Sequence, residues 1–342
     1  MSDHTAIEWC DATLNCWWGC TKVSDGCKFC YAEHLADHRH HKGNWGPTGI
    51  RQEVKSWRST LNKISNRAKS EGRRLKVFCQ SMSDTFEGPE TMGGIASDNW
   101  KLVRRLQDEL LGAILEHQEL DFLLLTKRPE NVLDVVHRHD CATTKGYNWQ
   151  WPSNLWIGTS VEDQKTADER IPHLLEIPAA VRFLSCEPLL GPVDLFDVAG
   201  TDCLDWDRDN YCKCGDGECS ECWQSPSAST IHWLICGGES GPNARPMHPD
   251  WAKSLRDQCQ SAGVPFFFKQ WGEWAPGEIM GPNRRSVPCA NWNGSEWDYS
   301  VAYPARPDDH CDDEPDVFRC GKKRAGRILD GSEWSQSPVV TP

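Results

Sequence analysis

The sequence has no excess of positive charge and no long hydrophobic run. Its 342 residues carry 37 Lys and Arg against 50 Asp and Glu, for a net charge of −13. This balance argues against a broadly basic nucleic-acid surface, because phosphate binding depends on clustered Lys and Arg, but it is compatible with a local basic channel. The apolar stretches are strand-sized and too short to span a membrane. The N-terminal residues lack a basic region followed by an apolar run, so we expect a cytoplasmic protein with no secretory signal.

Cysteine, by contrast, is abundant, and three of the 18 cysteines lie close together near the N-terminus. Cys20, Cys27 and Cys30 form a C-x6-C-x2-C pattern on a predicted loop that leads into a helix. Three thiolates can hold a four-iron cluster and leave one iron without a protein ligand. An open coordination position distinguishes a reactive metal site from a purely structural one. The pattern therefore predicts a reactive 4Fe-4S centre.

A closed metal site is the alternative for the same loop. Cys16 would add a fourth thiolate, in a C-x3-C-x6-C-x2-C pattern, and would complete a structural zinc site or a closed cluster. Such sites usually stabilise a small domain with little core. This loop borders a large predicted α/β domain that needs no such support, so we favour the open cluster.

A second cysteine-rich segment, residues 200–230, is acidic and interrupts two predicted strands, so we interpret it as an insertion. Five closely spaced thiols among Gly and Asp cannot form a hydrophobic core, and the cytosol keeps thiols reduced. A bound metal can supply the missing folding energy. We expect a zinc ion with Cys203 as a spare ligand, and an auxiliary iron–sulfur cluster is the alternative. The predicted zinc ligands are Cys212, Cys214, Cys219 and Cys222.

Short apolar runs alternate with amphipathic segments along most of the chain, which is typical of buried parallel strands joined by helices. The predicted strands are 76–79, 122–126, 155–158, 181–185, 231–236 and 265–269, with a first strand near 6–9. One predicted helix follows Ser97-Asp98. Three others cover about 129–138, 163–176 and 248–262. This order predicts a parallel (βα)6-7, partial or complete, TIM-like barrel over residues 1–275. Residues 276–342 are predicted to form an irregular C-terminal extension.

Polar residues follow each predicted strand. In parallel α/β folds, ligands bind at the carboxyl ends of the strands. We therefore expect these residues to share one pocket with the cysteine loop. The candidates for polar contacts with a cofactor or substrate are Ser83, Asp84, Thr159, Ser160, Glu187 and Glu239. Lys127, Arg128 and Lys269 are candidates for binding a carboxylate or phosphate.

Several segments resemble a known family. They are 7–15 (IEWCDATLN), 19–27 (GCTKVSDGC), 125–129 (LTKRP), 183–189 (FLSCEPL), 237–241 (GGESG) and 321–331 (GKKRAGRILDG). They resemble the uncharacterised phage protein family called gene-product thirty-seven/sixty-eight, which is similar to a distant branch of the radical S-adenosylmethionine enzymes.

The resemblance implies radical chemistry on S-adenosylmethionine bound at the cluster, with Phe29 beside the adenine and an electron donor as partner. The substrate is not readable from the sequence, and a nucleotide or nucleic acid is compatible with a phage setting. A non-enzymatic adaptor that binds zinc or iron–sulfur clusters is the second hypothesis.

Overall fold

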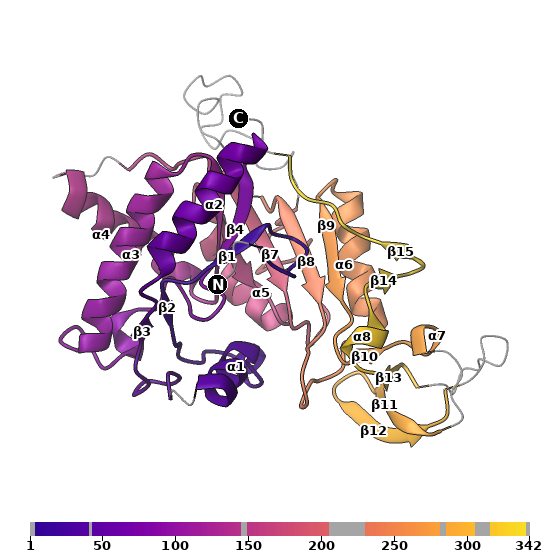
Figure 1. Cartoon of the computed structure of the whole chain (residues 1–342). Helices are drawn as coiled ribbons and strands as arrows, with labels where there is room; N and C mark the ends of the chain where they lie inside the picture. Colours follow the sequence, from indigo (N-terminus) through magenta and orange to yellow (C-terminus); the bar gives the residue numbers. More distant parts are fainter. Residues whose placement is uncertain are drawn as a thin grey trace.

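The computed structural model describes residues 4–40, 43–144, 149–204, 230–280, 285–304 and 315–339. Its centre is a curled, parallel seven-stranded sheet with strand order β1-β4-β5-β6-β7-β8-β9, which forms a half-barrel (Figure 1). The strands are β1 (Ala12–Leu14), β4 (Leu75–Cys79), β5 (Leu120–Thr126), β6 (Leu155–Ser160), β7 (Val181–Cys186), β8 (Trp233–Gly237) and β9 (Phe266–Gln270). Six of the predicted strands are confirmed, but the first is not near 6–9: it is β1, at residues 12–14.

Both faces of the sheet are apolar, which explains the near-continuous hydrophobic runs of its strands. Alternate residues point to opposite faces. In β4, Val77 and Cys79 pack into the large core beneath the helices, whereas Phe78 points into a smaller, aromatic cluster on the inner face. In β5, Leu124 likewise packs into the large core, and Leu123 packs into the aromatic cluster.

Helices cover the outer face of the sheet, as in other parallel α/β folds. Figure 1 shows α2 beside β1 and α6 beside β8. The longer helices are α1 (Tyr31–His40), α2 (Trp57–Glu71), α3 (Asp98–Glu116), α4 (Val132–Thr144), α5 (Gln164–Leu175) and α6 (Pro249–Ser261). The predicted start of α3 is confirmed, because the Ser97 side chain accepts a hydrogen bond of 3.1 Å from Trp100 N. The sequence analysis did not predict α2.

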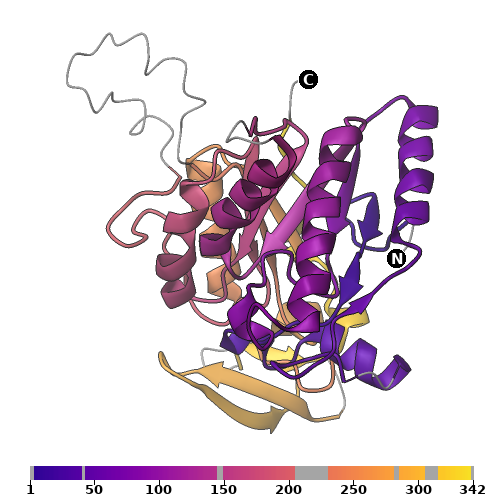
Figure 2. The ribbon, with the colours of Figure 1, turned by 90° about the vertical axis from the view of Figure 1, so that its left-hand side faces the viewer.

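The C-terminal region is not irregular as predicted, because it contains an antiparallel four-stranded sheet with strand order β10-β13-β11-β12. These strands are β10 (Trp274–Ala275), β11 (Val287–Trp292), β12 (Trp297–Ala302) and β13 (Val317–Arg319). Figure 2 shows the β11–β12 hairpin and α1 at the same end of the central sheet. Short helices α7 (Gly277–Met280) and α8 (Lys322–Ala325) lie beside each other.

The last described residues cover the free edge of β9. Phe268 N donates to Trp334 O at 2.9 Å, and Phe267 forms an antiparallel bridge with Ser335. Two small antiparallel two-stranded sheets complete the description. They pair β2 (Trp17–Trp18) with β3 (Gln52–Glu53), and β14 (Ile328–Leu329) with β15 (Ser332–Glu333). Arg327, just before β14, forms an ion pair with Glu8 near the N-terminus, so the tail also connects the two open edges of the half-barrel.

Candidate functional site

A cavity of about 650 Å³ lies at the carboxyl ends of the parallel strands and contains the cysteine loop. Cys20 follows β2, Cys27 ends the short 3-10 helix η1 (Asp25–Cys27), and Cys30 directly precedes α1. All three cysteines and Phe29 line the cavity. The sequence prediction that the cysteine loop and the strand ends share one pocket is therefore consistent with the structure.

Cys16 does not belong to this group. Its side chain is 1% exposed and packs in the main hydrophobic core between helices and sheet. Cys16 is not among the residues that line the cavity. The closed four-thiolate site would need this buried side chain to leave the core, so the arrangement favours three thiolates.

The three thiols do not form a single-ion site in the described part of the chain. Within the described ranges, no group of three or more His, Cys, Asp or Glu side chains is close enough to hold one metal ion. In a four-iron cluster each thiolate binds a different iron, so the ligands lie farther apart than those of one ion. Burial raises the pKa of Cys20 and of Cys30 in the absence of a metal. A coordinating metal deprotonates a thiol outright, so these raised values do not oppose ligation.

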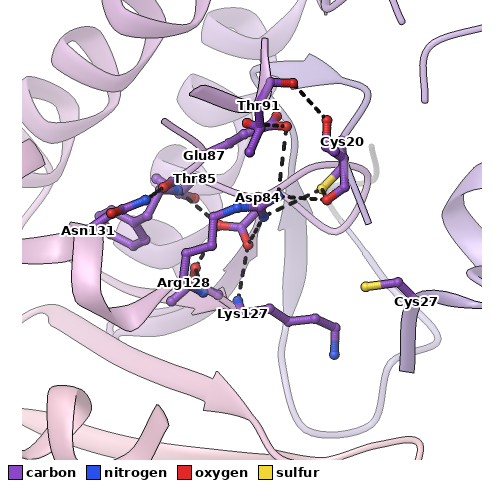
Figure 3. A network of polar contacts seen from close by, with 12 residues as sticks. Cys20, Cys27, Asp84, Thr85, Glu87, Thr91, Lys127, Arg128 and Asn131 are labelled. Atoms are coloured by element: carbon purple, nitrogen blue, oxygen red, sulfur yellow. Dashed lines mark hydrogen bonds and ion pairs between the residues drawn. The ribbon is translucent and has the colours of Figure 1, made fainter. Parts of the chain in front are cut away.

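Arg128 fixes the start of the cysteine loop against the end of β4 (Figure 3). Its Nη1 donates to Asp84 Oδ2 at 2.9 Å and lies 3.9 Å from Cys20 Sγ, while Nη2 donates to Thr21 O at 2.6 Å. Asp84 in turn accepts hydrogen bonds from Thr126 Oγ1 and from Lys127 N, at 2.7 and 3.1 Å. The carboxylate therefore joins the ends of β4 and β5 to the loop.

A second buried ion pair holds the start of the cysteine loop at Thr21. Arg51 and Glu87 are in contact at 2.6 Å, and both side chains are fully buried. Arg51 Nη2 also donates to Thr21 Oγ1 at 2.8 Å, and Thr21 Oγ1 donates to Thr91 O at 3.1 Å. These bonds satisfy the buried charges and hold Thr21, the residue after Cys20, in place.

Glu162, after β6, holds the middle of the loop. It accepts a hydrogen bond of 3.0 Å from Ser24 Oγ, pairs with Arg170 at 3.0 Å and contacts Lys127. Burial favours the neutral acid, but Lys127 and Arg170 outweigh it and lower the pKa of Glu162, so the carboxylate stays charged. A Cβ atom on Gly26 would lie 2.4 Å from Glu162 Oε1, so only glycine fits here without movement.

Arg245 holds the end of the loop that carries Phe29. It pairs with Glu239 at 2.7 Å and donates to Asp25 O at 3.0 Å. Its guanidinium carbon lies 5.3 Å from the centre of the Phe29 ring, within cation–π range. Glu239 therefore acts on the loop through Arg245.

The six charged residues predicted for the site differ in how much of their side-chain surface is exposed. Asp84, Arg128 and Glu239 keep only 7%, 4% and 6% of their side-chain surface exposed. Lys127, Glu187 and Lys269 keep 20%, 20% and 23%. Lys269 Nζ contacts both carboxylate oxygens of Glu187, at 2.8 and 2.7 Å, on the cavity wall. These three charged groups are the accessible ones among the six.

Of the remaining predicted residues, some line the cavity and others do not. Ser83 and Ser160 line the cavity, and Ser83 Oγ donates to Trp17 O at 3.2 Å. Thr159 is completely buried and is not part of the lining, because its hydroxyl donates to Thr126 O within the sheet at 3.0 Å. The predicted zinc ligands lie outside the described residues: Cys212, Cys214, Cys219 and Cys222.

Comparison with known proteins places the sequence in a family. The family model described as "Protein of unknown function (DUF5131)" matches residues 4–338. The chain belongs to this family. The DUF5131 match agrees with the expected uncharacterised family and says nothing of a phage origin or of radical chemistry. No curated protein and no solved structure matches the chain.

The sequence analysis missed the residues that hold the loop from a distance. Arg51, Glu87, Glu162 and Arg245 stand in no recognisable motif, and their partners lie far away in the sequence. The contact from Ser24 to Glu162, for example, spans 138 positions. Only the position of Glu162, directly after a buried strand, gave a local signal. In the described part of the chain, no helix is long and apolar enough to cross a membrane.

Proposed function

We propose that this chain is an iron–sulfur enzyme that uses S-adenosylmethionine for radical chemistry. The observation that carries the proposal is the joint position of Cys20, Cys27 and Cys30 on one cavity, with Cys16 buried elsewhere. Three thiolates fit a 4Fe-4S cluster with one open iron. When bound, such a cluster supplies the electron that cleaves S-adenosylmethionine, so that the adenosyl fragment can take a hydrogen atom from a substrate.

The chain's own residues would position the reactants and exclude water. A volume of about 650 Å³ is within the range of pockets that enclose a drug-sized ligand. Phe29, held by Arg245, offers a flat apolar surface for the adenine. Lys127 and Lys269 are accessible cations that can hold a carboxylate or a phosphate.

The buried ion pairs would keep the cysteines in position for ligation. Arg51, Arg128 and Arg245 each bond to the cysteine loop and to a carboxylate of the barrel. A loop fixed at both ends loses little conformational entropy when the cluster binds. The substrate, proposed as a nucleotide or nucleic acid, would enter beside the open iron, and an external donor would supply the electron.

Anaerobic reconstitution tests the proposal. The protein should take up about four irons per chain, turn brown and, once reduced, convert S-adenosylmethionine to 5′-deoxyadenosine. A colourless protein that binds only zinc would instead support the alternative, a non-enzymatic metal-binding adaptor. The triple Cys20→Ala, Cys27→Ala, Cys30→Ala variant is the control for iron bound elsewhere.

A further inference from the structure

A cluster of positive charge lies at the rim of the cavity, in an otherwise acidic chain. Residues 319–327 include five cationic side chains and no acidic one: Arg319, Lys322, Lys323, Arg324 and Arg327. The arginines have partners within the protein. Lys322 and Lys323 are exposed and form no ion pair with any part of the chain that the structure describes. Lys322 also lines the cavity.

An apolar and aromatic strip lies on β12, an edge strand of the C-terminal sheet. Tyr299 and Val301 are two residues apart on β12, so they share one face, and Tyr303 directly follows the strand. They are 59%, 69% and 68% exposed, which is unusual for three large apolar side chains in a row.

The strip is continuous with the cavity. The Tyr299 ring lies 5.8 Å from that of Trp274, and Trp274 Nε1 donates to Ala244 O at 2.7 Å. The next residue, Arg245, pairs with Glu239 at 2.7 Å. Glu239 is part of the cavity wall. Figures 1 and 2 agree that the β11–β12 hairpin lies at the same end of the central sheet as α1.

We propose that this rim binds single-stranded nucleic acid and presents one nucleotide of the strand to the cavity. Unpaired bases stack on tyrosine rings, and lysines contact the phosphates. The cavity can receive a nucleotide that has left the stack, as in other enzymes that modify a base. The proposal rests on the proposed function for the chemistry that follows.

The spacing of the aromatic residues favours a strand over a free nucleotide. Tyr299 lies on β12 and Tyr303 directly after the strand, four residues further along, which corresponds to about 13 Å of extended chain. One base cannot span this distance, whereas successive nucleotides can. Lys323 adds positive charge beside Lys322 but does not line the cavity, so a mononucleotide inside the cavity would make no use of it.

Fluorescence anisotropy with labelled 15-nucleotide single strands of DNA and of RNA tests the proposal on the full chain. We expect saturable binding that weakens as salt increases. Tyr299→Ala and Tyr303→Ala should each weaken binding roughly tenfold. The double variant Lys322→Ala, Lys323→Ala should reduce the salt slope by about two. Phe196→Ala and the pair Lys165→Ala, Lys253→Ala are controls at exposed positions that do not line the cavity and should bind as the unmodified protein does.

Several results would overturn the proposal: no binding of either strand, equal losses in the controls, or binding of a mononucleotide as tight as that of the 15-mer. Self-association that Tyr299→Ala and Tyr303→Ala abolish, without binding of either strand, would assign the strip to a protein contact instead. The triple cysteine variant separates the two proposals, because it should bind the strand normally and cleave no S-adenosylmethionine. Cleavage without strand binding would refute only the nucleic-acid inference.

Discussion

The guanidinium of Arg128 lies 3.9 Å from the sulfur of Cys20, and the same nitrogen donates to Asp84 at 2.9 Å. One buried cation therefore contacts both a predicted cluster ligand and the end of strand β4. Burial raises the pKa of Cys20, and the positive charge of Arg128 acts in the opposite direction. The hydrogen bond from Arg128 to Thr21 O fixes the cysteine loop. In this site, carboxylates follow the ends of the strands of the half-barrel, and arginines lie between these carboxylates and the cysteine loop.

The buried pair of Arg128 and Asp84 predicts a clear stability pattern. Arg128→Met leaves the Asp84 charge without its partner and should lower the free energy of unfolding by about 3–5 kcal/mol. The double variant Arg128→Met, Asp84→Asn removes both charges and should recover part of this loss. Urea unfolding measures all three proteins. Equal losses in the single and double variants would show that the charge pairing is not the cause.

Individual cysteine variants test the ligand set. Cys20→Ala, Cys27→Ala and Cys30→Ala should each abolish the cluster absorbance after anaerobic reconstitution, because each removes one of three thiolates. Cys16→Ala is the matched control and should keep the iron content, because Cys16 packs in the core and not on the cavity. A Cys16→Ala protein without iron would replace the open site by a closed one.

A substitution at Gly26 tests whether the close packing of the cysteine loop against Glu162 is needed for iron binding. Its added Cβ would lie within 2.4–2.6 Å of three atoms of Glu162. The Glu162 side chain cannot easily move away from the added Cβ, because its carboxylate contacts Lys127, Arg170 and Ser24. Gly26→Ala should therefore displace the loop and lower the iron content several-fold, as iron analysis would show.

Gly112→Ala is the matched control for Gly26→Ala. Gly112 lies inside α3, and nothing stands within 4 Å of its added Cβ. Alanine there should keep the iron content and raise stability by up to about 1 kcal/mol, because glycine is a poor helix former. Unchanged iron in both variants would contradict the tight contact between Gly26 and Glu162.

A half-buried histidine, His232, predicts part of the pH dependence of stability. Burial, together with the charge of Arg182, lowers the pKa of His232 to about 4. Since the unfolded value is about 6.5, the contribution of neutral His232 is complete above that pH and is lost as the pH falls towards 4. The loss between pH 7 and pH 5 should be about 2 kcal/mol.

His232→Asn is the variant that checks this assignment. The asparagine oxygen can accept the bond of 3.0 Å that Arg182 N donates to His232 Nδ1. Unfolding in urea at pH 5 and pH 7 should then show a smaller difference than in the unmodified protein. An undiminished difference would mean that other groups dominate in this range.

The sequence predicted the six longer parallel strands because each is apolar on both faces. It misplaced the first strand, because Ile7 and Trp9 are hydrophobic while the three residues of β1 carry almost no pattern. Helix α2 was missed because its sequence is largely polar, with only Trp57, Leu61, Ile64, Ser65 and Ala68 buried. The C-terminal sheet was missed for a similar reason, since β12 exposes most of its residues.

The sequence predicted that polar residues at the strand ends would lie close together, but it did not predict their partners. Parallel strands end at one edge, so polar residues after them were expected to meet, and Ser83, Lys127 and Lys269 do line one cavity. Which of them face a ligand depends on distant partners. Glu239, for example, is occupied by Arg245, and Asp84 by Arg128, so these carboxylates hold the loop.

The most direct test of the central claim is the cleavage of S-adenosylmethionine by the reconstituted, reduced full chain. We predict that 5′-deoxyadenosine accumulates above the level of the Cys20→Ala, Cys27→Ala, Cys30→Ala control, even without a substrate. The product can be measured by liquid chromatography with mass detection. A fully loaded and reduced cluster that yields no 5′-deoxyadenosine above this control would contradict radical chemistry at the cysteine loop.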